Sequence, residues 1–225
     1  MRLFISGTDT GVGKTVVTCL VLRALQTRGK SALGMKPVSA GINPEGMWDD
    51  VEQIRAASSI TAAPEDIAPY RLRAPASPHF AAAEDGTTIQ IAIILAAVER
   101  LERLAHMVVI EGVGGFRVPL SDRLDSADMA QAIGAPILLV VPMRLGCINH
   151  ALLTAEAIAH RGLTLVGWLA NAGIDPHYGR VAETIDTISD RINAFCIGIL
   201  PNLALEQCGA DRIAVDQLLE RLQAK

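Results

Sequence analysis

The sequence predicts an α/β protein with a predominantly parallel sheet flanked by helices on both faces. Short apolar or β-branched runs alternate with longer helical patterns, which is typical of parallel strands joined by helices. The run Ile137–Val141 is apolar at every position, as expected of a strand buried on both faces. Half of the 225 residues are hydrophobic but only 4% are aromatic, so we expect a core of Ala, Val, Ile and Leu in one domain, residues 1–225.

The predicted strands share short length and densely apolar side chains: Leu3–Ser6, Ala32–Met35, Met107–Ile110, Ile137–Val141, Leu165–Ala170 and Cys196–Leu200. The predicted helices have longer amphipathic patterns: Lys14–Arg28, Asp50–Ser58, Thr88–Ala105, Ala127–Ile133, Ile148–Arg161, Tyr178–Ile192 and Ala214–Leu222. The stretch 38–86 is rich in proline and less regular. There we expect long loops and short helices above the edge of the sheet.

Composition narrows the class of protein. The net charge is −4, without the basic footprint of a duplex-binding domain, so we expect no nucleic-acid partner. No apolar run approaches the ~20 residues of a membrane helix, so we expect no membrane partner. The N-terminus does not resemble a signal peptide, and the four cysteines form no CxxC pair, so we expect reduced thiols and a cytoplasmic location.

The strongest motif is the glycine-rich loop Gly7–Thr15, which ends in Gly-Lys-Thr between a predicted strand and a predicted helix. This is the context of a P-loop, whose backbone N–H groups and helix N-terminus bind phosphate, and it makes the predicted fold P-loop NTPase-like. Lys14 would contact the β- and γ-phosphates of ATP, and the Thr15 hydroxyl would coordinate Mg²⁺. The spacing is not standard, because Thr8 stands where the usual pattern has its first glycine.

Charged residues follow other predicted strands, and parallel strands end at one ligand-binding edge of the sheet. Glu111 could complete a Mg²⁺ shell, or it could be a solvated loop glutamate. Asp50 could be a further ligand, or an acid that stabilises a helix N-terminus. Lys36 could neutralise a phosphoryl group in transfer, or it could be a surface lysine. The segment Gly146–Asn149 precedes a helix and could bind an anion or only cap that helix.

Together these segments resemble the dethiobiotin synthetase family, in order and across nearly the whole chain. The resembling segments are GTDTGVGKT (Gly7–Thr15), KPVSAG (Lys36–Gly41), Asp50, SPH (Ser77–His79), EGVGG (Glu111–Gly115), PLSD (Pro119–Asp122), LGCINHALLT (Leu145–Thr154), GLTLVGWLAN (Gly162–Asn171) and ILPN (Ile199–Asn202).

The resemblance implies an ATP-dependent cyclo-ligase of biotin synthesis that uses Mg²⁺. Its partners would be 7,8-diaminononanoate (7,8-diaminopelargonate), CO₂ or bicarbonate, and ATP. One amine captures CO₂ as a carbamate, the carbamate oxygen takes the γ-phosphoryl group, and the second amine closes the ureido ring of dethiobiotin. The resemblance also implies a homodimer, in which the substrate carboxylate lies at a helix N-terminus of the partner subunit.

The same resemblance assigns residues. Lys36 and Lys14 would be catalytic, and Thr15, Asp50 and Glu111 would be the metal ligands. The residues implied for ATP binding are Gly11, Val12, Gly13, Lys14, Thr15, Val16, Asp50, Glu111, Gly112, Val113, Gly114, Asn171, Pro201, Asn202 and Leu203. Those implied for substrate binding are Thr10, Ser39, Ala40, Gly146, Cys147 and Asn149.

Three positions depart from the pattern of the family. Some members carry Glu where this chain has Gly11, so no acidic side chain contributes there. Members often carry Ser or Thr where this chain has Ala40, so the hydroxyl contact to substrate is either absent or supplied by Ser39. Some members carry tryptophan where this chain has Asn202, which would change adenine packing.

Three other classes of protein remain as alternatives. A switch ATPase of the partitioning or positioning type would carry a signature lysine where this chain has Asp9. A cobyrinate-type amide ligase would need a glutaminase domain, which we do not expect in 225 residues. A nucleotide-binding module without chemistry would not need Lys36 and Glu111 at strand ends.

Overall fold

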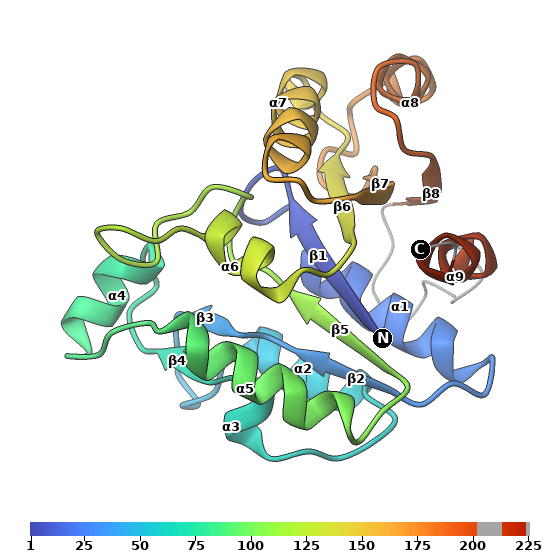
Figure 1. Cartoon of the computed structure of the whole chain (residues 1–225). Helices are drawn as coiled ribbons and strands as arrows, with labels where there is room; N and C mark the ends of the chain where they lie inside the picture. The colour runs from blue at the N-terminus through green and yellow to red at the C-terminus, as the bar shows by residue number, and fades with distance from the viewer. Residues whose placement is uncertain (202–212, 224–225) are drawn as a thin grey trace.

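The computed structural model describes residues 1–201 and 213–223, and its centre is a six-stranded sheet. The strands are β1 (Arg2–Gly7), β2 (Ala32–Met35), β5 (Met107–Glu111), β6 (Ile137–Pro142), β7 (Leu165–Asn171) and β8 (Cys196–Leu200). Their order is β2-β5-β1-β6-β7-β8, and every neighbouring pair is parallel. β1 therefore lies inside the sheet, with β5 and β6 on either side (Figure 1).

Helices cover both faces of this sheet. They are α1 (Lys14–Gln26), α2 (Asp49–Ala57), α3 (Pro64–Ile67), α4 (Pro78–Glu84), α5 (Ile91–Glu102), α6 (Ser126–Ile133), α7 (Cys147–His160), α8 (Val181–Ser189) and α9 (Val215–Gln223). α1, α2 and α9 pack on one face, whereas α5, α6, α7 and α8 pack on the other (Figure 1). The predicted fold class is confirmed, with helix ends that differ by a few residues.

Alternation along each strand supplies the two cores. In β6, Leu138 and Val140 join the cluster under α1, whereas Leu139 and Val141 join the cluster under α7 and α8. All of these side chains are fully buried. Successive side chains of a strand point to opposite faces, so a strand with apolar residues at every position is stable only when both faces are covered.

The stretch 38–86 contains a second sheet that the sequence reading did not predict. β3 (Val38–Ala40) and β4 (Tyr70–Leu72) pair in parallel, with Ser39 opposite Arg71. Each strand has only three residues, which is too short for a periodic pattern to distinguish a strand from a loop. The short helices expected in this stretch are present as α3 and α4.

The register of the central strands brings distant charged residues to the same edge. Met35 pairs with Ile110, so Lys36 and Glu111, the next residues, reach the carboxyl end of the sheet together. β1 ends beside them, because Ile5 pairs with Glu111. The P-loop leaves β1 two residues later.

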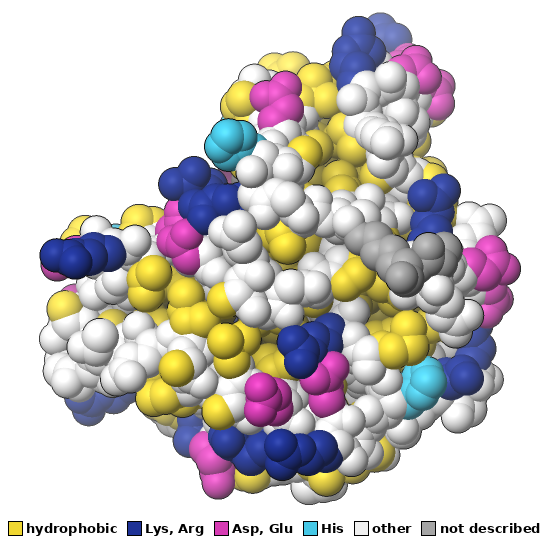
Figure 2. Space-filling view, in the orientation of Figure 1, with side chains coloured by type: hydrophobic (Ala, Val, Ile, Leu, Met, Phe, Trp, Pro, Cys, Tyr) yellow, Lys and Arg dark blue, Asp and Glu magenta, His cyan; other side chains and the backbone are white. Residues whose placement is uncertain are grey.

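The surface carries charges of both signs. On the face shown in Figure 2, Lys and Arg side chains lie beside Asp and Glu side chains. Many of these charges are paired, as in the ion pairs Arg2–Glu102 and Arg161–Asp128. None of the helices within residues 1–201 and 213–223 is long and apolar enough to cross a membrane.

Candidate active site

A cleft of about 730 Å³ lies at the carboxyl ends of β1, β2 and β5. Its lining comes from the P-loop and α1, from the ends of β2 and β5, from α2, and from the loop before α4. Predicted site residues in this lining are Thr10, Gly11, Gly13, Lys14, Thr15, Val16, Lys36, Ala40, Asp50, Glu111, Val113 and Gly114. Twelve of the residues that the sequence predicted to form the site therefore line the same cleft.

The P-loop backbone depends on glycine at specific positions. Gly13, the residue before α1, has a φ of 92°, and a Cβ there would lie 2.3 Å from the amide nitrogen of Asn171. Gly7, at the end of β1, approaches Val12 so closely that a Cβ would lie 2.6 Å from that side chain. A larger residue at position 7 would therefore clash with the loop. The loop leads directly into the N-terminus of α1, where an anion is stabilised.

Lys14 is buried in the cleft wall. Its Nζ donates a hydrogen bond of 2.9 Å to the backbone oxygen of Asp9. Burial, assisted by the positive charge of Lys36, lowers the pKa of Lys14 to about 8. A phosphate group at the P-loop would favour the charged form of Lys14 again, because an opposite charge at short range stabilises the ammonium.

Lys36 lies between two carboxylates. Its Nζ is 2.6 Å from Oε1 of Glu111 and 3.0 Å from Oδ2 of Asp50. Burial alone would lower the pKa of Lys36, but the charges of Glu111 and Asp50 outweigh it and raise that pKa. Lys36 and Glu111 are 5% and 1% exposed, so neither is the surface lysine or the solvated glutamate that the sequence left open.

Glu111 has an oxygen available for a cation. Oε1 accepts hydrogen bonds from Lys36 and, at 2.9 Å, from the Thr15 hydroxyl. Oε2 is buried and has no hydrogen-bond partner among the described residues. A buried carboxylate oxygen without a partner is costly, and a hard cation would satisfy it.

The oxygen ligands of the cleft suit a Mg²⁺ ion that is shared with a nucleotide. They do not form a complete metal site made of protein side chains alone. Within the described residues, no group of three His, Cys, Asp or Glu side chains is arranged to hold a metal ion. Mg²⁺ is usually bound by one or two carboxylates together with phosphate oxygens and water. Glu111, Asp50 and the Thr15 hydroxyl would supply such a partial shell around a nucleotide.

Ser39 and Ala40 point in different directions. Ala40 lines the cleft, whereas the buried Ser39 donates a 2.6 Å hydrogen bond to Oδ1 of Asp50. Asp50 lies in the first turn of α2, so it is at once an acid near a helix N-terminus and a member of the charged cluster. Whether Ser39 contacts substrate stays a prediction.

Other predicted residues lie behind or beside the cleft. The Asn171 amide donates to the backbone oxygen of Val12 at 2.9 Å and accepts from Gly173, so it braces the P-loop from behind. Gly112 and Pro201 do not line the cleft, and Asn202 and Leu203 lie outside the described residues.

The segment Gly146–Asn149 begins α7 but is not part of this cleft. Gly146 has a φ of 88° and makes no side-chain capping bond, so capping by a side chain does not explain the segment. An ion pair of 2.8 Å between Arg144 and Asp9 links the loop before α7 to the P-loop of the same chain. Asp9 stands where switch ATPases would carry their signature lysine, and it is committed to this contact.

Sequence reasoning assigned no role to six residues of the cleft lining: Gln53, Pro75, Ala76, Ser77, Pro78 and Val118. Gln53 lies one helical turn after Asp50, a spacing that would have placed it on the same face of α2. Ser77 and Pro78 belong to a segment that carried the family resemblance. The other three have no chemical signature in the sequence and enter the cleft only through the path of their loops.

The cleft combines a phosphate-binding loop, two lysines and two carboxylates. Such an arrangement can hold a nucleotide triphosphate, neutralise charge on a phosphoryl group in transfer, and position a second reactant beside it. Catalysis of this kind relies on fixed charges in a water-poor site more than on covalent chemistry by the protein.

Comparison with known proteins agrees with this chemistry. A family model described as an AAA domain matches residues 1–207. The chain is 53% identical over 211 residues to the ATP-dependent dethiobiotin synthetase of Aromatoleum aromaticum, covering 92% of each protein. It is 49% identical over 198 residues to the protein of the same name from Nitrosospira multiformis, covering 88% of this chain and 87% of that protein.

Solved structures show the fold at much lower sequence identity. The cell division ATPase MinD of Pyrococcus furiosus has a TM-score of 0.59 at 15% identity, covering 99% of this chain and 98% of that one. MinD of Aquifex aeolicus has a TM-score of 0.61 at 15% identity, covering 100% and 97%. These proteins are P-loop NTPases, and at this identity the comparison shows a shared fold and nothing finer.

Proposed function

Because the chain belongs to the ATP-dependent dethiobiotin synthetase family, we propose that its cleft closes the ureido ring of dethiobiotin. The enzyme is a cyclo-ligase of biotin biosynthesis that joins 7,8-diaminononanoate and CO₂ and releases ADP and phosphate. The alternative of a MinD-like switch ATPase rests only on a distant likeness of fold. The observation that carries the proposal is the meeting of Lys14, Lys36 and Glu111 at one cleft in a chain with these relatives.

Each side chain has a role that follows from its position. Lys14, at the end of the P-loop, binds the β- and γ-phosphates of ATP. Lys36, held beside the cleft by Glu111 and Asp50, faces the phosphoryl group and stabilises the charge that builds on it during transfer. The carbamate oxygen then bonds to phosphorus as ADP leaves, and the second amine displaces phosphate from the carbamoyl carbon.

Mg²⁺ is proposed as the metal, with Thr15, Asp50 and Glu111 as its protein ligands. The unpartnered Oε2 of Glu111 and the nearby Thr15 hydroxyl support this assignment. When bound, the ion would neutralise phosphate charge. Gly11, Gly13 and Val16 line the phosphate end of the cleft, and Asn171 together with the segment from Pro201 is proposed to meet the adenine.

The diamine is proposed to occupy the part of the cleft between Thr10, Ala40 and the loop before α4. Its carboxylate would bind at Gly146, Cys147 and Asn149 of a second copy of the chain, so we propose a homodimer. These three residues begin α7 and do not line the cleft of their own chain, which supports a site shared between two copies. We also propose one domain, residues 1–225, in the cytoplasm, where thiols such as Cys19, Cys147 and Cys196 stay reduced.

The decisive experiment incubates the purified protein with ATP, Mg²⁺, bicarbonate and 7,8-diaminononanoate and follows dethiobiotin by mass spectrometry. We expect dethiobiotin and ADP in equal amounts, and ATP consumption only when both the diamine and bicarbonate are present. ATP turnover without dethiobiotin, especially turnover stimulated by lipid or DNA, would favour a switch ATPase instead.

A further inference from the structure

The hydroxyl of Ser39 is hydrogen-bonded to Asp50, a contact within the protein that does not involve substrate. Ser39 lies in the middle of β3 and is 1% exposed, and its hydroxyl donates to Oδ1 of Asp50 over 2.6 Å. Its neighbour Ala40 is the residue of β3 that lines the cleft. Successive strand residues point in opposite directions, so a hydroxyl at position 39 is directed to Asp50 and one at position 40 would be directed to the cleft.

The two oxygens of Asp50 are thereby divided between two tasks. Oδ1 accepts from the Ser39 hydroxyl and, at 2.9 Å, from the backbone N–H of Val51. Oδ2 lies 3.0 Å from Nζ of Lys36, within the charged cluster of the cleft. Two hydrogen bonds on Oδ1 fix the rotation of the carboxylate, so the lone pairs of Oδ2 keep one direction.

We infer that Ser39 is a positioning residue, whose hydroxyl holds the Asp50 carboxylate ready to bind the metal ion of the nucleotide complex. The inference rests on the proposed function, in which Asp50 is a magnesium ligand. Hydrogen bonds from outside the metal shell orient the ligands, and losing one typically weakens metal binding by about 10- to 100-fold. Ser39 thus acts through Asp50 and does not touch the reacting atoms.

The test measures metal affinity directly. Mn²⁺ prefers the same hard oxygen ligands as Mg²⁺ and can be titrated by electron paramagnetic resonance into protein saturated with ADP. We expect Ser39→Ala to weaken nucleotide-dependent Mn²⁺ binding by about 10- to 100-fold. Ser39→Cys, which has the same shape in a slightly larger side chain but offers only a weak donor, should show a loss in the same direction.

The chain offers a matched control in the adjacent residue. Ala40→Ser adds a hydroxyl one position along β3, on the side of the strand opposite to the Ser39 hydroxyl. We expect Ala40→Ser to leave Mn²⁺ affinity within twofold of the wild-type value. The double variant Ser39→Ala/Ala40→Ser has the wild-type composition with the hydroxyl moved by one residue, and it should bind Mn²⁺ as weakly as Ser39→Ala.

Affinity for ADP in the presence of EDTA separates positioning from general damage. It should be the same in the wild type, Ser39→Ala and Ser39→Cys, because no metal is then involved. Mn²⁺ affinity unchanged in both Ser39 variants would overturn the inference, as would an equal loss of metal-free ADP binding. If the wild type binds ADP but shows no nucleotide-dependent Mn²⁺ site, the proposed metal ligands are wrong, which is a different failure from that of Ser39 alone.

Discussion

The charge of Lys36 is decided by a competition between burial and its two neighbours. Burial disfavours the ammonium, yet contacts with Glu111 and Asp50 keep it protonated and raise its pKa. A buried cation paired in this way has little freedom to move before substrate arrives. It is therefore placed in advance where negative charge develops during phosphoryl transfer.

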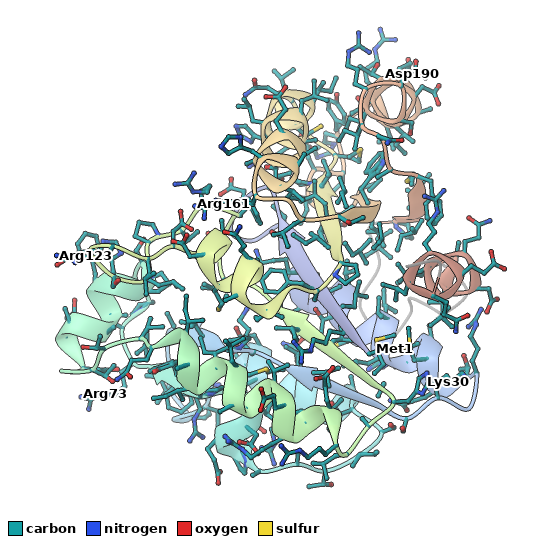
Figure 3. All side chains as sticks on the ribbon, viewed as in Figure 1. Met1, Lys30, Arg73, Arg123, Arg161 and Asp190 are labelled. Carbon is teal, nitrogen blue, oxygen red and sulfur yellow. The ribbon has the colours of Figure 1, made fainter. Side chains whose placement is uncertain are left out.

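We predict that Lys36→Ala reduces kcat by about 100-fold or more, the usual cost of removing a group that stabilises developing charge. Nucleotide binding, measured by titration calorimetry, should change little, because Lys14 and the P-loop remain. Lys30→Ala is the control, because Lys30 precedes β2 on the side of Met1 (Figure 3), whereas the cleft lies at the carboxyl ends of the strands. A normal kcat in Lys36→Ala would remove Lys36 from the mechanism.

The exposed side chain of Asn149, in the first turn of α7, belongs to the proposed carboxylate site. We predict that Asn149→Ala raises KM for the diamine by about 10-fold, the loss expected for one hydrogen bond to a charged group. KM for ATP should stay within twofold of wild type. His150→Ala, at the next exposed position of α7, is the control. Equal losses for both substrates would argue against a carboxylate site at α7.

At the scale of elements, the junction of P-loop and α1 depends on two glycines with positive φ. Gly11 and Gly13 both have positive φ, of 71° and 92°, but a Cβ at Gly11 meets nothing within 4 Å, whereas one at Gly13 meets Asn171. A side chain at either position would strain the backbone, but only at Gly11 is there room for a Cβ.

This difference predicts unequal effects of alanine. Gly11→Ala should cost about 1–2 kcal/mol of unfolding free energy, from strain in the left-handed region. Gly13→Ala should cost more and should also weaken ATP binding, because the loop must move away from Asn171. Urea unfolding measures the free energy of unfolding of both variants, and calorimetry measures their affinity for ATP. Equal losses of unfolding free energy in the two variants would contradict the steric role of Asn171.

A capping box begins α6. Asp125 accepts from the N–H of Asp128, and Asp128 accepts from the N–H of Asp125. The backbone N–H of Asp125 and the side chain of Arg161, whose position beside α6 is visible in Figure 3, lower the pKa of Asp128. The folded protein thus favours the charged form of Asp128.

The lowered pKa of Asp128 makes the stability of the folded protein depend on pH. A carboxyl with a lowered folded pKa stabilises the protein above its unfolded pKa, and this contribution disappears as pH falls through the folded value. We predict that Asp128→Ala loses about 1 kcal/mol of unfolding free energy at pH 7 and that the difference from wild type narrows below about pH 4. Urea unfolding at both pH values tests this. Asp122→Ala, in an exposed loop, is the control, and a difference that persists in acid would be the contrary outcome.

At the scale of the whole molecule, large apolar side chains are exposed beside the proposed carboxylate site. Leu145 is 89% exposed just before α7, and Leu153 is 56% exposed within it. Apolar surface that remains in water favours association. A homodimer formed through this region would cover both leucines and would bring Asn149 to the cleft of the other copy.

We predict that Leu145→Asp shifts the protein from dimer to monomer in sedimentation velocity. Turnover should fall in parallel, while ATP binding to each P-loop should remain. Leu104→Asp, a second exposed leucine in the loop between α5 and β5, should leave the dimer intact. A dimer unaffected by Leu145→Asp would place the interface elsewhere.

Local patterns in the sequence were enough to predict the parallel sheet, the P-loop and the charged residues that follow the strands. Runs such as Ile137–Val141 identify their strands, because burial on both faces requires apolar side chains at every position. Gly7–Thr15 identifies its function, because only glycine lets backbone N–H groups approach phosphate at a helix N-terminus. The family followed from the order of several such segments.

The partners of those residues became known only from the arrangement of the strands in space. Lys36 meets Glu111 because β2 and β5 are neighbours with a particular register, and no local pattern encodes a contact across 75 residues. The sequence did not predict β3 and β4, because strands of three residues are too short to show a periodic pattern. The direction of the Ser39 hydroxyl depends on β3, so it could not be predicted either. Chemistry that depends on residue type can be predicted from the sequence. Chemistry that depends on which groups lie next to each other can be known only from the folded structure, because folding brings those groups together.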